Sequence, residues 1–144
     1  MRVSSDGADG VYRSRFEGGF SRYTWHDVGT GGYWTVESAM GAISYYGADA
    51  TGHLRANARV MGSSGVFRYH LVETVMPLGA RVRYRYRRSG GYSLLSRVEY
   101  AFQANAEGDR TNPLHRVDLI YEDRPDALSD AKSGVELRLD QRLR

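Results

Sequence analysis

The chain of 144 residues contains no cysteine and no long hydrophobic run. Without cysteine it has no disulfide bond, no thiol nucleophile and no thiolate metal site. No stretch approaches the roughly 18 consecutive apolar residues that a membrane-spanning helix needs. The start, Met1 to Gly7, turns polar at once and lacks the apolar core of a secretory signal peptide. Lysine is scarce too, since Lys132 is the only basic residue that is not arginine.

The charge balance is mild. The 20 basic and 17 acidic residues give a net charge of +3, with both signs interspersed, and this pattern does not indicate nucleic-acid binding. One basic cluster consists of Arg81, Arg83, Arg85, Arg87 and Arg88. We interpret it as the solvated face of a sheet, paired with acids such as Glu99 or Asp118 on neighbouring strands. Contact with RNA or an acidic cargo is the alternative.

Tyrosine and glycine are abundant, at 11 and 17 residues, and together they favour strands joined by tight turns. Helical periodicity is almost absent, and its best candidate, residues 126–133, has no apolar stripe. Period-two alternation is clearest at residues 81–87, where Val82, Tyr84 and Tyr86 share one face. The sequence therefore predicts an all-β fold, an antiparallel sheet of successive hairpins with one solvated side.

Nine strands are predicted from this alternation, near residues 11–16, 20–25, 33–38, 42–46, 66–74, 81–87, 94–102, 116–122 and 135–143. Residues 1–10 are expected to be disordered and 48–65 to form a loose loop. One pattern occurs twice: Val-Glu, a small residue, a turn with Gly-Ala, and a strand that ends in tyrosines. The first copy starts at Val36 and the second at Val72, which indicates repeated strand–turn–strand units.

Four pieces of sequence, in order, resemble the SpvB/TcaC-type segment of toxin-complex B components, a family related to RHS and YD-repeat shell proteins. The pieces lie at residues 12–18, 33–47, 67–86 and 116–143. The positions that carry the resemblance are Trp34, Gly41, Tyr46, Gly47, Gly79, Tyr84, Tyr86, Tyr121, Glu122, Arg124, Pro125 and Asp126. The family's D-x-x-G-N turn is replaced here by residues 75–80, which lack both the aspartate and the asparagine.

The resemblance implies a function. It makes residues 1–144 a single fragment of a β-shell that encapsulates a toxin or effector polypeptide. The implied partners are the remainder of a larger shell protein, or its C-component, and the enclosed polypeptide. The implied location is extracellular, as part of a secreted toxin complex, after a cytoplasmic stage before release. No membrane span, nucleic acid or cofactor is expected.

No catalytic, cofactor-binding or metal site is predicted, and the chain is not expected to be an enzyme. An ADP-ribosyltransferase needs Ser-Thr-Ser and Glu-x-Glu, and both are absent here. The four histidines are too dispersed for a metal site, and residues 29–32 form a turn rather than a phosphate loop. The acids Glu122 and Asp126 could suggest a glycosidase pair, but an arginine between them beside Pro125 favours a structural corner.

Two other functions remain open at this stage. One is a fragment of an outer-membrane β-barrel, because Tyr/Arg alternation suits a polar lumen. The other is a free-standing β-sandwich that binds a ligand. The shell interpretation further predicts that the chain is incomplete, that its last strand (135–143) lacks a partner on one side and that the isolated chain self-associates. It also predicts a common buried layer that contains Trp34, Val36, Tyr84, Tyr86, Val117, Leu119, Leu137 and Leu139.

Overall fold

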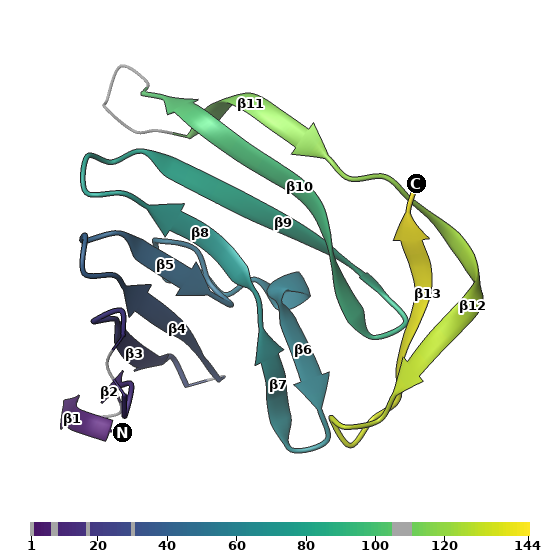
Figure 1. The fold of residues 1–144 in the computed structure, drawn as a ribbon, viewed down its shortest axis with the longest axis horizontal. Helices are drawn as coiled ribbons and strands as arrows, with labels where there is room; N and C mark the ends of the chain where they lie inside the picture. Colours follow the sequence, from purple (N-terminus) through teal and green to yellow (C-terminus); the bar gives the residue numbers. More distant parts are fainter. Residues whose placement is uncertain (1, 7–8, 17, 30, 105–110) are drawn as a thin grey trace.

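The computed structural model describes residues 2–6, 9–16, 18–29, 31–104 and 111–144. Within them the chain forms strands, one 3-10 turn and no α-helix (Figure 1). The strands are β1 (Arg2–Asp6), β2 (Asp9–Arg13), β3 (Arg22–Asp27), β4 (Gly32–Glu37), β5 (Ile43–Tyr46), β6 (Arg59–Gly62), β7 (Gly65–Tyr69), β8 (Leu71–Val75), β9 (Arg81–Ser89), β10 (Tyr92–Gln103), β11 (Asn112–Asp118), β12 (Tyr121–Asp130) and β13 (Leu137–Leu143). The all-β prediction is confirmed, and the weak helix candidate at 126–133 lies largely in β12.

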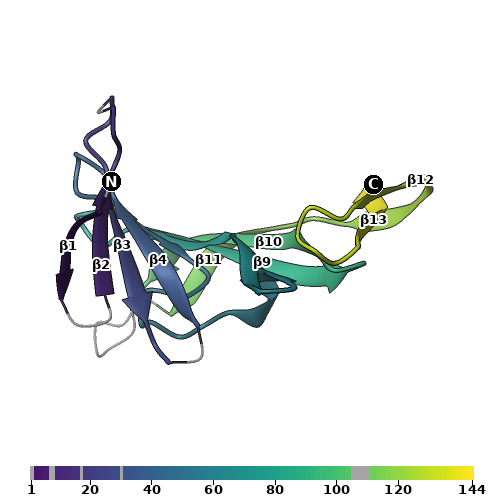
Figure 2. The same ribbon diagram turned by 90° about the horizontal axis from the view of Figure 1, so that it is seen from below.

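One nine-stranded sheet dominates the molecule, with the order β1-β2-β3-β4-β5-β8-β9-β10-β11. Every pair in it is antiparallel, so the sheet is a run of hairpins interrupted only by the β6–β7 hairpin. The β6–β7 and β12–β13 hairpins form two small separate sheets. Figure 2 shows β1–β4 standing steeply against the long β9 and β10, as the twist of a many-stranded sheet requires.

The repeated sequence pattern produces two matching hairpins. In the β4–β5 turn, Gly41 has φ 78° and donates its N–H to the C=O of Ser38. In the β8–β9 turn, Gly79 has φ 79° and donates to Met76 in the same way. Both turns need a residue with positive φ, which glycine adopts without strain. The missing family residues therefore do not change the hairpin, and the two copies lie side by side because β5 pairs with β8.

Two predicted strands are each split in the structure. The strand expected at 66–74 breaks at His70, whose N–H donates to Ala58 O and whose C=O accepts from Gly47 N–H. The strand expected at 116–122 breaks after Asp118, and a new strand, β12, begins at Tyr121. Alternation continues through both breaks, so the pattern alone does not reveal that the chain changes partners there.

The structure differs from two expectations in its described residues, namely disorder in residues 1–10 and a loose loop at 48–65. Residues 2–6 pair with β2 as strand β1, whereas residues 1 and 7–8 lie outside the described part of the chain. The segment 48–65 contains the 3-10 turn η1 (Ala56–Ala58) and strand β6. Its residues Ala48 and Asp49 are among the most buried in the molecule, because Asp49 organises the loop through hydrogen bonds.

The nine-stranded sheet has two chemically different faces, because alternate residues point to opposite sides and paired residues share a side. One is the charged face, which includes Arg22, Glu37, Glu73, Arg83, Glu99 and Arg116. The other is the aromatic face, which includes Tyr12, Trp25, Trp34, Tyr84, Tyr86 and Val117. On the aromatic face, Trp34 lies 5.3 Å from Tyr12 and 5.1 Å from Trp25 between ring centroids. Tyr69 of β7 closes this cluster from the hairpin side, 5.8 Å from Trp25.

The sheet is thinly covered. Among described residues the buried apolar side chains are Ala48, Ala58, Val60, Val72, Leu94, Phe102 and Leu137. Large apolar residues on β11 and β12 are exposed, and Val117 is 50% exposed. The predicted common buried layer is therefore wrong for Val117, because no described element packs on this end of the aromatic face.

The β6–β7 and β9–β10 turns both contact the C-terminal hairpin, β12–β13. Ser63, in the β6–β7 turn, donates its N–H to Ser133 O at 3.0 Å. Arg138 of β13 donates its N–H to Gly90 O in the β9–β10 turn at 2.7 Å. A side chain at Gly90 would lie 1.8 Å from the C=O of Arg138, so this position requires glycine. These contacts hold the β12–β13 hairpin against the main sheet.

Candidate functional site

The residues that carry the family resemblance do not converge on one site. Gly41 and Gly79 form the two matching turns, Trp34 belongs to the aromatic cluster, and residues 121–126 lie on the C-terminal hairpin. Gly47 has φ 83°, and a side chain there would clash with the ring of Tyr69. The spread of these residues is typical of positions that shape a fold rather than of a catalytic centre.

Two tyrosines of the family resemblance hydrogen-bond to the backbone of neighbouring strands. The hydroxyl of Tyr86 donates to Leu71 O at 2.8 Å, its ring lies 5.0 Å from His70, and burial raises its pKa to about 12. The hydroxyl of Tyr121 donates to Leu95 O at 2.8 Å. Burial raises the pKa of Tyr121 as well. Each ring packs on apolar surface while its hydroxyl satisfies a backbone carbonyl.

The acids near Pro125 are each paired with an arginine. Arg124 donates from Nε and Nη2 to the two carboxylate oxygens of Asp126, at 3.1 and 2.9 Å. This hydrogen bonding lowers the pKa of Asp126. Glu122 accepts from Arg142 Nε at 2.8 Å across the β12–β13 pair. Both acids are engaged by arginines, so these contacts favour a structural corner over a glycosidase pair.

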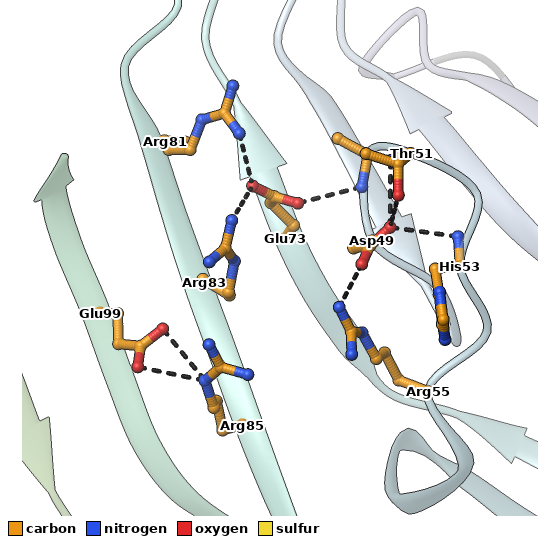
Figure 3. A network of polar contacts seen from close by, with 10 residues as sticks. Asp49, Thr51, His53, Arg55, Glu73, Arg81, Arg83, Arg85 and Glu99 are labelled. Carbon is orange, nitrogen blue, oxygen red and sulfur yellow. Dashed lines mark hydrogen bonds and ion pairs between the residues drawn. The ribbon is translucent and has the colours of Figure 1, made fainter. Parts of the chain in front are cut away.

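The charged face holds two almost fully buried glutamates, shown in Figure 3. Glu73, on β8, is 1% exposed and receives hydrogen bonds from Arg81 at 3.3 Å, Arg83 at 3.4 Å and the backbone N–H of Ala50 at 3.0 Å. A buried carboxylate is tolerated only when cations and hydrogen-bond donors surround it. Glu73 therefore ties β8, β9 and the loop after β5 together.

Glu99 has the same role on β10. It is 4% exposed, and both of its carboxylate oxygens accept from Arg85 Nε at 3.1 Å. Arg97 lies 3.8 Å from Glu99 and also donates to Asp118 at 2.5 Å. The predicted pairing of the basic cluster with Glu99 is confirmed, whereas Asp118 pairs with Arg97 and Arg116 instead.

Asp49 is the centre of the loop that covers this region (Figure 3). Its carboxylate accepts from the N–H and hydroxyl of Thr51, the N–H of His53 and the guanidinium of Arg55. Burial alone would raise the pKa of Asp49, but these hydrogen bonds outweigh it and lower the pKa below its ordinary value. Sequence reasoning missed Asp49, although Asp-x-Thr is a known signature of an Asx turn.

A hollow of about 510 Å³ lies on the charged face near β2–β5. At its margin, His26 Nε2 lies 2.9 Å from Thr35 Oγ1, and His26 Nδ1 lies 3.3 Å from Asp9 Oδ2. The order hydroxyl, imidazole, carboxylate is that of an activated nucleophile. Thr35, however, lies mid-strand between Thr24 and Tyr45, where the sheet ladder uses the backbone N–H groups that would otherwise bind an oxyanion. The arrangement orients His26 and links three strands.

Within the part of the chain that the structure describes, no three histidine or acidic side chains gather as metal ligands. No described helix has the length and hydrophobicity needed to cross a membrane. The contacts described above are ion pairs, ring contacts and hydrogen bonds from side chains to the backbone, and they stabilise the sheet.

Comparison with known proteins identifies solved structures that share this fold. A scan against models of protein families and a search of curated proteins both find no match. Among solved structures, the N-terminal domain of effector protein SpvB from Salmonella typhimurium strain LT2 superposes with a TM-score of 0.70 and 18% identity. TcdB2-TccC3, with or without its hypervariable C-terminal region, superposes with a TM-score of 0.76 and 17% identity.

The chain covers only a fraction of these proteins. It matches over 94% of its own length to 56% of the SpvB domain, and over its whole length to 9% of TcdB2-TccC3. The protein thus has the fold of a segment found in SpvB and in TcdB2-TccC3. The resemblance to the SpvB/TcaC type that the sequence predicts is confirmed at the level of fold.

Proposed function

We propose that this chain is a structural segment of a toxin-complex shell, whose sheet forms part of a wall around an enclosed toxin or effector polypeptide. The observation that carries the proposal is the match of the whole chain to 9% of TcdB2-TccC3. A segment of that size contributes wall area rather than a self-contained activity. On this proposal the chain is not an enzyme, acts outside the cell in a secreted complex and has the remainder of the shell as its main partner.

The construction of the sheet supports this role. A wall needs a wide sheet that keeps its shape without a thick core behind it. Here the charged face is stabilised by the buried Glu73 and Glu99 and their arginines, and the other face by packed aromatic rings. A free-standing sandwich would instead need a second broad sheet, but the nine-stranded sheet is joined only by two-stranded hairpins among the residues that the structure describes.

Thiol accessibility tests the proposal, because the chain lacks cysteine and any introduced cysteine is unique. Arg22 and Tyr23 are neighbours on β3 that face opposite sides of the sheet and are both exposed. Arg22→Cys and Tyr23→Cys form a matched pair for labelling with a bulky polyethylene glycol maleimide. In the isolated chain both variants are expected to react.

The same two variants are then expressed from the natural locus, with the flanking sequence and neighbouring genes. A shell wall is expected to protect one of the two cysteines from the maleimide until the protein is denatured. Electron microscopy of the same preparation is expected to show a hollow particle. If both positions react equally and no particle forms, the shell function is wrong.

A further inference from the structure

The outer edge of β11 is an unused pairing surface. Figure 1 shows β11 at the margin of the nine-stranded sheet, and no described strand pairs with its outer side. The hydrogen bond from Leu119 N–H to Ser96 O, at 2.9 Å, shows which residues near the end of β11 turn their backbone groups toward β10. Residues 117 and 119 therefore turn their N–H and C=O groups toward β10, and residues 116 and 118 turn theirs outward.

A row of alternating charges crosses the sheet and ends at this edge. Glu73 of β8 pairs in register with Arg83 of β9, then with Glu99 of β10 and finally with Arg116 of β11. The side chain of Arg116 is 63% exposed, and that of Asp118 beside it is 43% exposed. The edge therefore presents one cation and one anion, two residues apart on the same face. Within one copy Arg116 Nε lies 3.3 Å from Asp118 Oδ2, so pairing with a second copy adds contacts between copies to this exposed ion pair.

This edge is complementary to itself. If a second copy lies antiparallel with a twofold axis at Val117, Arg116 of each copy faces Asp118 of the other. Residues 116 and 118 both turn their backbone groups outward, so they form hydrogen-bonded pairs in the same register that matches the charges. The same register sets Leu114, 59% exposed, near Ile120, 65% exposed, which lies just beyond β11 and whose C=O accepts from Arg144 N–H at 3.0 Å.

We propose that β11 is a homotypic docking edge, through which two copies of this chain pair into one continuous antiparallel sheet. The charge row then runs without a break from Glu73 of one copy, through Arg116 and the second copy's Asp118, into the second copy's Arg97. Any other strand would need an acid opposite Arg116 and a base opposite Asp118, and this chain supplies both. The inference does not depend on the proposed shell function.

Charge reversal tests the interface by analytical ultracentrifugation of the whole chain over a concentration series at low salt. Arg116→Asp alone puts like charges opposite each other in both pairs of its homodimer, and so does Asp118→Arg. Each variant is expected to dimerise roughly tenfold or more weakly than the original chain. An equimolar mixture of the two variants is expected to dimerise about as well as the original, because every pair in the heterodimer then joins opposite charges.

Matched controls separate the interface from net charge and from folding. Arg68→Asp and Asp126→Arg make the same charge changes at exposed positions away from the edge, and both are expected to leave the dimer intact. Arg116→Pro removes an outward N–H without touching the β10 ladder and is expected to abolish the dimer with unchanged circular dichroism. A chain that stays monomeric, a dimer indifferent to both reversals, or a mixture that fails to restore pairing would each overturn the proposal.

Discussion

The two halves of the nine-stranded sheet are stabilised by different forces. Strands β2–β4 rely on an aromatic cluster, in which Trp34 contacts Tyr12 and Trp25. Strands β8–β10 rely on carboxylates buried among arginines, above all Glu73 and Glu99. The comparison shows two ways in which a sheet with little covering can remain ordered: ring contacts join β2–β4, whereas paired charges on one face, together with buried apolar residues such as Val72 and Leu94, join β8–β10. Changes confined to one half should therefore reveal its own chemistry.

The largest effect is expected in the charged half. Glu73→Ala leaves the guanidinium groups of Arg81 and Arg83 without their shared carboxylate and is expected to lower the free energy of unfolding by about 3–5 kcal/mol. Urea denaturation measures the change. Glu122→Ala, which removes a glutamate from the exposed pair with Arg142, is expected to cost less than about 1 kcal/mol. Equal small losses for both glutamates would show that burial of Glu73 adds nothing.

In the aromatic half, Trp34→Ala empties the centre of the ring cluster and is expected to cost roughly 3 kcal/mol. The same denaturation measurement detects it, and the fluorescence of Trp25, the other member of the tryptophan pair, reports on the cluster directly. Phe16→Ala, at a residue that is 84% exposed, serves as the control with a change within about 0.5 kcal/mol. A stability loss no larger than that of Phe16→Ala would contradict the packing described here.

Acidification is expected to weaken the fold in two stages, by smaller amounts. Burial and the nearby Arg68 hold the pKa of His70 below its ordinary 6.5. The unfolded chain therefore takes up the proton first, and stability falls as the pH drops below about 6.5. The pKa of Asp49 lies below its ordinary 3.8, so its contribution is present above that pH and is lost as the pH falls further. His70→Phe is expected to abolish only the first fall in stability when the free energy of unfolding is measured against pH. If that fall is unchanged in the variant, groups other than His70 cause it.

The smallest effect concerns a single hydroxyl. Tyr86→Phe keeps the ring against His70 but removes the hydrogen bond to Leu71 O, at an expected cost of about 1 kcal/mol. Thermal unfolding is sensitive enough to detect this change. Tyr100→Phe, at an exposed ring, is the matched control and is expected to be neutral. If both substitutions are neutral, Tyr86 does not fasten β9 to β8.

The sequence predicts local features of this fold well. Alternation locates most strands, the repeated pattern locates the Gly41 and Gly79 turns, and the pairing of Arg85 with Glu99 follows from the charges on adjacent strands. These features depend on neighbours along the chain or on directly paired strands. The period-two rule applies to them without knowledge of the rest of the molecule.

Non-local features escape such reasoning. Glu73 lies between Val72 and Thr74 on its strand, and its burial depends on the loop before β6, in which the N–H of Ala50 donates to its carboxylate. The packing of Gly90 against Arg138 joins residues far apart in sequence and leaves no periodic trace. The order in residues 48–65 was missed because Asp49 organises them by hydrogen bonds rather than by apolar burial. The residues of the family resemblance mark the fold, but they do not reveal this network.

Hydrogen exchange on the original chain and on Glu73→Gln tests most directly whether the two halves are stabilised separately. The substitution keeps the side-chain shape but removes the charge that Arg81 and Arg83 share. We expect amides of β8, β9 and β10 to lose protection while those of β2–β4 keep theirs, because local opening follows local contacts. Uniform loss across both halves, or no loss in β8–β10, would contradict this division.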